Sequence, residues 1–266
     1  ESYQKLIYKL HLFIWKLEIF MEIQEEFEKT GNWLFRWRSY LPLALIPLFL
    51  LAMEKYHYLN NSETSDNFWE LLCLLISFIG FGIRVWTVGC APIRTSGRNT
   101  KSQIADTLNT TGMYSLVRHP LYLGNFLMIL GIVLFTRHLW LMLIYILLFV
   151  LYYERIIFTE EAFLKRKFGN DFIVWAKKTP AFIPKFKNYR PPAHKFNWKK
   201  ALKTEYNGFA ALLLSMFALE LYGDWLIKHK IDLDLHWIIL VGIAVFTWIM
   251  VRFLKKYTRV LDISKK

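Results

Sequence analysis

Apolar residues fill six long segments of the chain, and polar residues gather between them. Several of these segments approach the roughly 20 residues that a helix needs to cross a hydrocarbon core about 30 Å thick. The pattern therefore predicts an all-α, polytopic membrane protein with about six transmembrane helices. The third and fourth segments are short and closely spaced, which predicts a tight helical hairpin whose second helix continues past its apolar part. The expected spans are Leu41–Leu51 (extended through Tyr56), Phe68–Pro92, Leu121–Phe135, Trp140–Tyr153, Phe209–Ile227 and Trp237–Leu254.

A different pattern precedes the first span. Between Leu6 and Met21, apolar residues recur at helical spacing, and lysines and glutamates occupy the other face. This pattern predicts an interfacial amphipathic helix over residues 1–38, with Trp33 and Trp37 at the membrane boundary, as interfacial aromatics often are. A helix that binds a partner protein fits the same pattern equally well.

The net charge of +13 changes the picture only through its distribution. A basic chain suggests nucleic-acid binding, but here the lysines and arginines alternate between loops. They are frequent at 36–38, 94–118, 155–203 and 252–266, whereas residues 60–67, 136–138 and 228–235 carry few or are balanced by acids. This is the charge bias that orients membrane proteins. It predicts that both termini are cytoplasmic, and it argues against a nucleic-acid partner.

The cysteine content predicts no disulfide framework and no metal site. Cys73 and Cys90 are the two cysteines of the chain and fall on one expected helix. At 1.5 Å rise per residue they are roughly 25 Å apart, too far to bridge each other. Both are expected to be small apolar fillers.

A proline-rich linker, Pro180–Pro192, divides the chain. Prolines at this density interrupt helices. We expect a core over residues 39–190, with four spans and a cytoplasmic site, followed by the linker and two additional spans over 191–266. Both polar regions that could carry chemistry, Arg94–Pro120 and Arg155–Pro184, lie in the four-span part on the expected cytoplasmic side.

The first candidate region is Thr111–Gly124, which contains Arg-His-Pro-x-Tyr-x-Gly. Pro120 suits the first turn of a helix, so His119 would lie where unpaired backbone N–H groups attract anions. Gly124 would let another backbone or a ligand approach closely. An interfacial loop that simply caps a span with proline would look the same when taken alone.

The second candidate region begins at Glu160-Glu161, directly after a very apolar run. A carboxylate at that level is costly unless it has a partner, such as a ligand cation or Arg155. The plain alternative is a solvated helix face, with Glu161 paired to Lys165 at i,i+4. A third region, Arg94–Asn109, is compatible with an ordinary polar surface loop.

Together the two motifs resemble the isoprenylcysteine carboxyl methyltransferase and phospholipid methyltransferase superfamily. The resemblance covers roughly Phe81–Pro184 and includes Arg118–Gly124 and the series Glu160, Glu161, Leu164, Phe168, Gly169, Phe172, Trp175, Pro180 and Pro184. It implies S-adenosylmethionine as cosubstrate. The implied cosubstrate-binding residues are Asn99, Asp106, Thr107, Leu108, Asn109, Tyr114, His119, Pro120, Leu121, Tyr122 and Glu160.

The resemblance also implies catalytic roles for Glu160 and an arginine that orients the acceptor. Carboxyl methyltransferases of the family carry that arginine four residues before the first glutamate, where this chain has Ile156. Arg155 stands one residue earlier and is the expected substitute.

Methyl transfer to an anionic oxygen needs no general base, whereas an amine must first lose a proton. We therefore expect O-methylation of an acidic group on a membrane lipid, with catalysis mainly by positioning. The variant loop Arg94–Asn109 is similar to that of the bacterial branch that methylates a lipid A phosphate, which implies the bacterial inner membrane. Methylation of an isoprenylcysteine carboxylate or of phosphatidylethanolamine are the enzymatic alternatives. A membrane scaffold or a transporter is the non-enzymatic one.

Overall fold

The computed structural model describes residues 21–38, 40–54, 56–58, 62–92, 95, 103–231 and 233–262. All of the regular secondary structure in these ranges is helical. Within the described residues, four helices are long and apolar enough to cross a membrane: α3 (Glu63–Cys90), α6 (Leu139–Phe168), α8 (Trp198–Lys228) and α9 (Leu235–Tyr257). Two shorter apolar helices, α2 (Ile46–Met53) and α5 (Pro120–Phe135), accompany them. The all-helical membrane fold is confirmed, with four long candidate spans.

The expected first span is broken into two short pieces. A 3-10 helix, η1 (Leu41–Leu45), is followed by α2, and each has a proline in its first turn. Pro42 and Pro47 donate no backbone hydrogen bond, so each favours the start of a new helix over continuation of the previous one. The combined segment is therefore shorter than the span that its apolar sequence predicts.

The hairpin of α5 and α6 agrees with its prediction. Residues 136–138 connect the helices, and α6 continues beyond Tyr153 to Phe168. It stops at Gly169, whose φ of +52° interrupts the helix before α7 (Asn170–Lys178). Glycine tolerates this left-handed backbone without a Cβ clash. Glu160 and Glu161 thus belong to the same continuous helix as the apolar part of α6.

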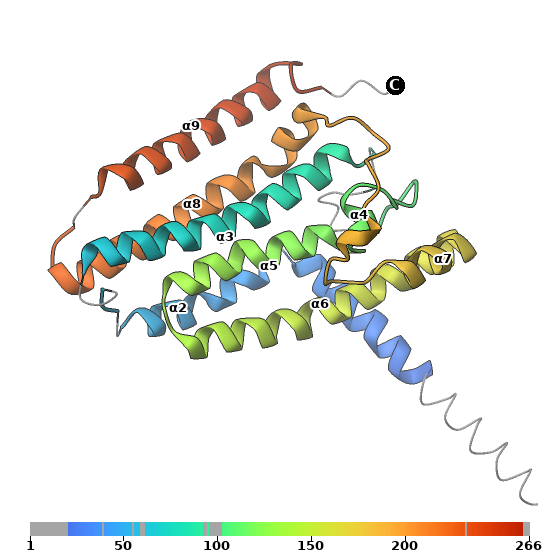
Figure 1. Cartoon of the computed structure of the whole chain (residues 1–266), viewed down its shortest axis with the longest axis horizontal. Helices are drawn as coiled ribbons and strands as arrows, with labels where there is room; N and C mark the ends of the chain where they lie inside the picture. Colours follow the sequence, from blue (N-terminus) through green and yellow to red (C-terminus); the bar gives the residue numbers. More distant parts are fainter. Residues whose placement is uncertain are drawn as a thin grey trace, which may run out of the picture.

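The bundle is organised around α3, which lies against both α5 and α8, with α9 packed on α8 (Figure 1). The connections α5–α6 and α8–α9 lie at one end of the bundle. The short helix α4 (Met113–Leu116), α7 and the long loops lie at the other (Figure 1). The chain beyond the linker is therefore packed onto the preceding part, because α8 lies along α3. Cys73 is buried in this core, in line with its expected role as a filler.

The N-terminal helix packs on α6 in its described part, residues 21–37. The rings of Phe27 and Phe158 meet edge to face at 5.5 Å, and Arg166 forms an ion pair with Glu28 at 2.8 Å. Trp33 and Trp37 are half exposed, as boundary aromatics would be. Residues 1–20, which carry the rest of the expected amphipathic pattern, lie outside the described residues.

Glycines allow α3 and α5 to approach each other closely. A Cβ at Gly80 would lie 2.5 Å from the backbone oxygen of Gly124, and one at Gly124 would meet Arg84 Cγ at 2.5 Å. We expect Gly80→Leu to destabilise the protein by about 1–3 kcal/mol or more, the usual result of overpacking. Gly82→Leu, on the same helix with nothing within 4 Å, is the matched control. Melting in detergent checks this, and equal melting temperatures for the two variants would contradict the packing.

Candidate active site

A cavity of about 1300 Å³ lies between the loop-bearing end of the bundle and its apolar interior. Its outer part is bordered by residues 103–109, by the start of α5 and by the distal part of α6. Its inner part is bordered by apolar residues of α2, α5 and α8. We call these the polar arm and the apolar arm. Both candidate motifs contribute to the polar arm, through His119, Tyr122 and Glu160.

The proline-rich linker holds the first motif in place. The backbone N–H groups of Arg118 and His119 donate to the carbonyl oxygens of Pro180 and Ala181 at 2.9 and 3.3 Å, and Lys185 N–H donates to Leu116 O at 3.0 Å. The prolines cannot continue an α-helix, and residues 180–185 lie beside residues 116–119 through these hydrogen bonds. The linker therefore positions His119 in addition to separating two groups of spans.

Arg118 ties the first motif to α6 and α7. Its guanidinium donates to both carboxylate oxygens of Glu161, at 2.8 and 3.2 Å. It also donates to the carbonyl oxygens of Ala176 and Thr179 at the end of α7, at 2.8 and 3.0 Å. A cation at a helix C-terminus is favourable for the helix dipole. Arg118 is thus occupied by protein groups, and the expected pairing of Glu161 with Lys165 is replaced by a pairing with Arg118.

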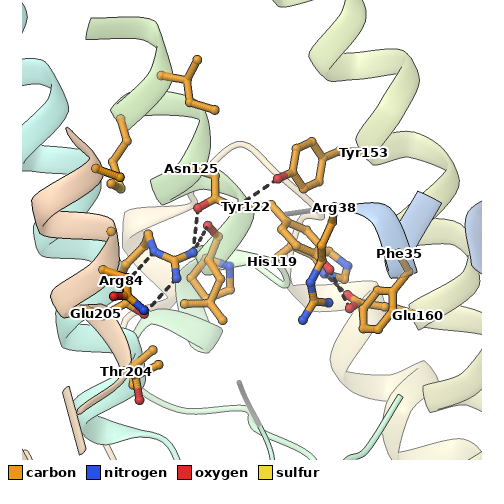
Figure 2. Close-up of a pocket in the computed structure, with 18 of the residues that line it drawn as sticks. Phe35, Arg38, Arg84, His119, Tyr122, Asn125, Tyr153, Glu160, Thr204 and Glu205 are labelled. Carbon is orange, nitrogen blue, oxygen red and sulfur yellow. Dashed lines mark hydrogen bonds and ion pairs between the residues drawn. The ribbon is translucent and has the colours of Figure 1, made fainter. Parts of the chain in front are cut away.

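His119 lies between the carboxylates of Glu160 and Glu161, and Figure 2 shows it beside Glu160. Its Nε2 is 2.9 Å from Glu161 Oε1, and its Nδ1 is 3.5 Å from Glu160 Oε2. The Tyr122 hydroxyl donates to Glu160 Oε1 at 2.6 Å, and its ring stacks on that of His119. His119 caps the start of α5, whereas both glutamates come from α6. Adjacent glutamates can both reach His119 because the imidazole presents a nitrogen on each side.

The surroundings of His119 favour its protonated form. Burial of the ring disfavours the charge, but the hydrogen bonds and negative charges of Glu160 and Glu161 outweigh burial and raise the pKa of His119 above its usual 6.5. A protonated imidazole donates from both nitrogens, which is what two carboxylate neighbours require. The imidazole at the centre of the polar arm is thus held between two carboxyl groups that favour its charged form.

This raised pKa makes the stability of the protein depend on pH. A side chain whose pKa is higher in the folded than in the unfolded protein stabilises the folded state. The stabilisation is complete at a pH below the unfolded-state pKa, and it is lost as the pH rises through the folded-state pKa. We expect the melting temperature of the parent to exceed that of His119→Gln most at about pH 6, and the gap to narrow towards about pH 9. Melting curves of both proteins across this range test it, and a gap that widens with pH would contradict a protonated His119.

The cosubstrate-binding residues inferred from the resemblance converge in the structure. Asp106, Thr107, Leu108, Asn109, Tyr114, His119, Pro120, Leu121, Tyr122 and Glu160 all line the cavity. Trp175 of α7 joins them and donates its indole N–H to Tyr114 O at 3.2 Å. Asn99 lies outside the described residues. Segments that are far apart in sequence thus form one continuous wall.

Arg155 is placed differently from its expected role. Its guanidinium lies 3.7 Å from the ring centroid of Phe27, on the side of α6 that contacts the N-terminal helix, and it is not among the cavity residues. Ile156 is fully buried in the apolar core. The 100° step between neighbouring helical positions accounts for the displacement of Arg155 from the cavity, because α6 is regular here.

Two other arginines, Arg38 and Arg84, line the cavity instead (Figure 2). Arg84 of α3 forms an ion pair with Glu205 of α8, at 2.8 and 2.9 Å, and donates to Asn125 Oδ1 at 2.6 Å. Arg84 and Glu205 belong to neither of the two motifs. The one sequence feature that could have indicated their pairing is that Arg84 and Glu205 each lie near the end of an apolar segment, where a charged side chain needs a partner.

Comparisons with known proteins agree with the two motifs. The phospholipid methyltransferase family model matches residues 69–171. The chain is 36% identical to a protein-S-isoprenylcysteine O-methyltransferase of Schizosaccharomyces pombe over 29% of this chain and 33% of that protein. The matched family segment contains α5 and α6 but ends before α8.

Two bacterial proteins named for metal resistance are also similar. The cobalt-zinc-cadmium resistance protein CzcN of Cupriavidus metallidurans is 41% identical over 44% of this chain and 52% of its own length. The nickel-cobalt-cadmium resistance protein NccN of Alcaligenes xylosoxydans xylosoxydans is 32% identical over 58% of this chain and 65% of its own length. The alignments thus span about half to two thirds of these relatives, whose names describe no reaction. No solved structure matches the chain.

Proposed function

Because the central segment of this chain belongs to the isoprenylcysteine carboxyl methyltransferase and phospholipid methyltransferase superfamily, we propose that the protein is an integral membrane methyltransferase. It uses S-adenosylmethionine to O-methylate an acidic group of a membrane lipid. The observation that carries the proposal is the His119–Glu160–Tyr122 cluster, which lies in a cavity that also has an apolar arm inside the bundle. A polar cosubstrate and a lipid can therefore approach one another from different sides.

The polar arm has groups that suit each part of S-adenosylmethionine. Its ammonium and ribose hydroxyls can donate to Glu160, whose side chain is 23% exposed. The positive end of the α5 helix dipole attracts its carboxylate. Tyr122 and Trp175 offer aromatic faces to a sulfonium cation. When bound, the sulfonium supplies a methyl group that an acceptor oxygen takes, while the electrons of the broken S–C bond return to sulfur.

The residues of the polar arm favour an acceptor that is already anionic. His119 is held by two carboxylates, and Tyr122 donates to Glu160. Both side chains are therefore already hydrogen-bonded and are not free to act as a general base. An amine such as that of phosphatidylethanolamine would need a base to remove its proton. A lipid phosphate or carboxylate needs none. A lipid A phosphate is the acceptor we favour, and an isoprenylcysteine carboxylate is the second candidate because of the relative that is named for that activity.

Binding of the cosubstrate separates this proposal from a membrane scaffold or a transporter. Purified protein in neutral detergent is titrated calorimetrically with S-adenosylmethionine and with S-adenosylhomocysteine. We expect saturable binding of both, at concentrations between about 1 μM and 1 mM, the usual range for enzyme substrates. Absence of saturable binding, from a sample that melts cooperatively, would contradict an enzymatic role for the polar arm.

A further inference from the structure

The ion pair between Arg84 and Glu205 lies on the wall of the cavity (Figure 2). The Glu205 side chain is 2% exposed, and that of Arg84 is 16% exposed and borders the cavity. Buried charges of this kind are costly to desolvate, and hydrophobic replacements are often more stabilising. A charged pair on a cavity wall therefore calls for a functional explanation.

The guanidinium of Arg84 has one edge that neutral groups occupy. Its Nε and one terminal nitrogen donate to Glu205. The other terminal nitrogen donates to the amide oxygen of Asn125 at 2.6 Å and to Leu121 O at a long 3.5 Å. An anion would be a stronger acceptor for this second edge, because charge-assisted hydrogen bonds exceed neutral ones. Glu205 would then hold the guanidinium in a fixed orientation.

A chain of contacts connects Arg84 with the candidate cosubstrate residues. Asn125 donates to the Tyr153 hydroxyl at 3.0 Å, and the rings of Tyr153 and Tyr122 lie 4.6 Å apart. Tyr122 in turn donates to Glu160. Arg84 therefore faces Glu160 across the cavity (Figure 2). A group bound at Arg84 would lie beside the polar arm.

The apolar arm extends from the same place and has the character of a hydrocarbon site. Gly208 leaves space on the wall formed by α8. Ile46 and Leu50 of α2 line this arm and are about half exposed. The apolar wall consists of Leu43, Leu45, Ile46, Phe49, Leu50, Met128, Ile129, Ile132, Ala211, Leu212, Ala218 and Leu219.

We propose that Arg84 binds the acidic headgroup of the lipid acceptor, with a hydrocarbon chain of that lipid in the apolar arm and Glu205 as the positioning residue for Arg84. This inference rests on the proposed function. It also gives α8, which lies outside the matched family segment, a direct part in acceptor recognition. O-methylation removes negative charge from the acceptor, so Arg84 holds the substrate more tightly than the product.

Dodecyl phosphate in maltoside micelles is a suitable probe, because it combines one acidic headgroup with one hydrocarbon chain. We expect calorimetric titration to give saturable binding to the parent protein. Arg84→Gln should weaken that binding by about tenfold or more, as loss of a buried charged partner does. Glu205→Gln should strengthen it, because the amide oxygen can still accept a hydrogen bond from Arg84 while the site gains a net positive charge. Arg166→Gln, which breaks the exposed pair with Glu28 and does not line the cavity, is the matched control.

The opposite expected changes in affinity for dodecyl phosphate distinguish a headgroup-binding role of the ion pair from a purely structural one. If the ion pair only stabilises the structure, either substitution should weaken the binding of dodecyl phosphate. Equal loss of affinity in Arg84→Gln and Glu205→Gln would therefore overturn the proposal. The proposal is also overturned if Arg84→Gln binds dodecyl phosphate with the affinity of the parent protein. S-adenosylhomocysteine is titrated into every variant and should bind with unchanged affinity. If the parent binds dodecyl phosphate in the expected way but does not bind S-adenosylhomocysteine, the proposed function fails and the headgroup site stands.

Gly208→Leu tests the apolar arm without replacing a charged residue, and it tests the proposal if Arg84→Gln and Glu205→Gln do not fold. A Cβ at Gly208 has ordinary contacts, 3.7 Å to Glu205 Oε2 and 3.9 Å to Met128 Cε, so the larger side chain is accommodated by filling the cavity. Dodecyl phosphate should bind about tenfold more weakly, with S-adenosylhomocysteine unaffected. Gly242→Leu on the outside of α9 is the control. Parental affinity in Gly208→Leu would remove the hydrocarbon chain from this arm.

Discussion

Replacing Glu160 by glutamine is expected to lower methyl transfer by about ten- to a hundredfold, the contribution of one or two hydrogen bonds to a charged group. The amide keeps the shape of the side chain but loses the charge that attracts the ammonium of S-adenosylmethionine. It also replaces an acceptor of the 2.6 Å hydrogen bond from Tyr122 by a group with half the accepting capacity. The rate is measured as transfer of labelled methyl from S-adenosylmethionine to the lipid extract of membranes that contain the protein.

Two further variants on α6 show whether the loss is specific. Glu154→Gln changes an exposed carboxylate on the same helix and should leave the rate unchanged. Glu161→Gln removes the partner of Arg118, and we expect it to lower the melting temperature because the contact between α5, α6 and α7 loosens. Glu160→Gln should affect the rate more than the stability. Full activity in Glu160→Gln would remove α6 from the active site.

Replacing His119 by alanine is expected to weaken binding of S-adenosylhomocysteine by about ten- to a hundredfold. The ring is 7% exposed and lies between two carboxylates, so its removal leaves Glu160 and Glu161 to repel each other and any ligand carboxylate. Tyr122→Phe loses one charge-assisted hydrogen bond and should weaken binding by about tenfold. Calorimetric titration of each variant gives these affinities.

Tyr145→Phe provides the control for the tyrosine substitution. Its hydroxyl donates to Phe126 O at 2.9 Å inside the apolar core, and Tyr145 does not line the cavity. Loss of that hydrogen bond should lower stability without changing the affinity for S-adenosylhomocysteine. Parental affinity in both His119→Ala and Tyr122→Phe would place the cosubstrate elsewhere and refute the assignment of the polar arm.

The apolar segments were sufficient to predict helices, because a chain inside a membrane must satisfy its backbone N–H and C=O groups with internal hydrogen bonds, as a helix does. They could not predict where local chemistry interrupts a helix. Pro47 divides the first apolar segment, and the left-handed Gly169 ends α6. Such breaks depend on one residue and leave the hydrophobic pattern of the segment unchanged.

The two motifs predicted most of the polar arm because each lies within one local stretch of sequence. They could not reveal partners from elsewhere in the chain. Helical spacing suggested Lys165 for Glu161, whereas the fold supplies Arg118 across 43 positions. Glu205 is 121 positions from Arg84 and belongs to no motif. Its role depends on how α8 packs against α3, and that packing is a property of the tertiary structure.

The most direct test of the account is mass spectrometry of lipids from membranes incubated with S-adenosylmethionine that carries a trideuterated methyl group. We expect one class of acidic lipid to gain the labelled methyl on oxygen when the parent protein is present, and to gain little when Glu160→Gln replaces it. If no lipid acquires the label from the parent protein, or if Glu160→Gln labels lipids equally well, the protein does not methylate a membrane lipid through this cavity.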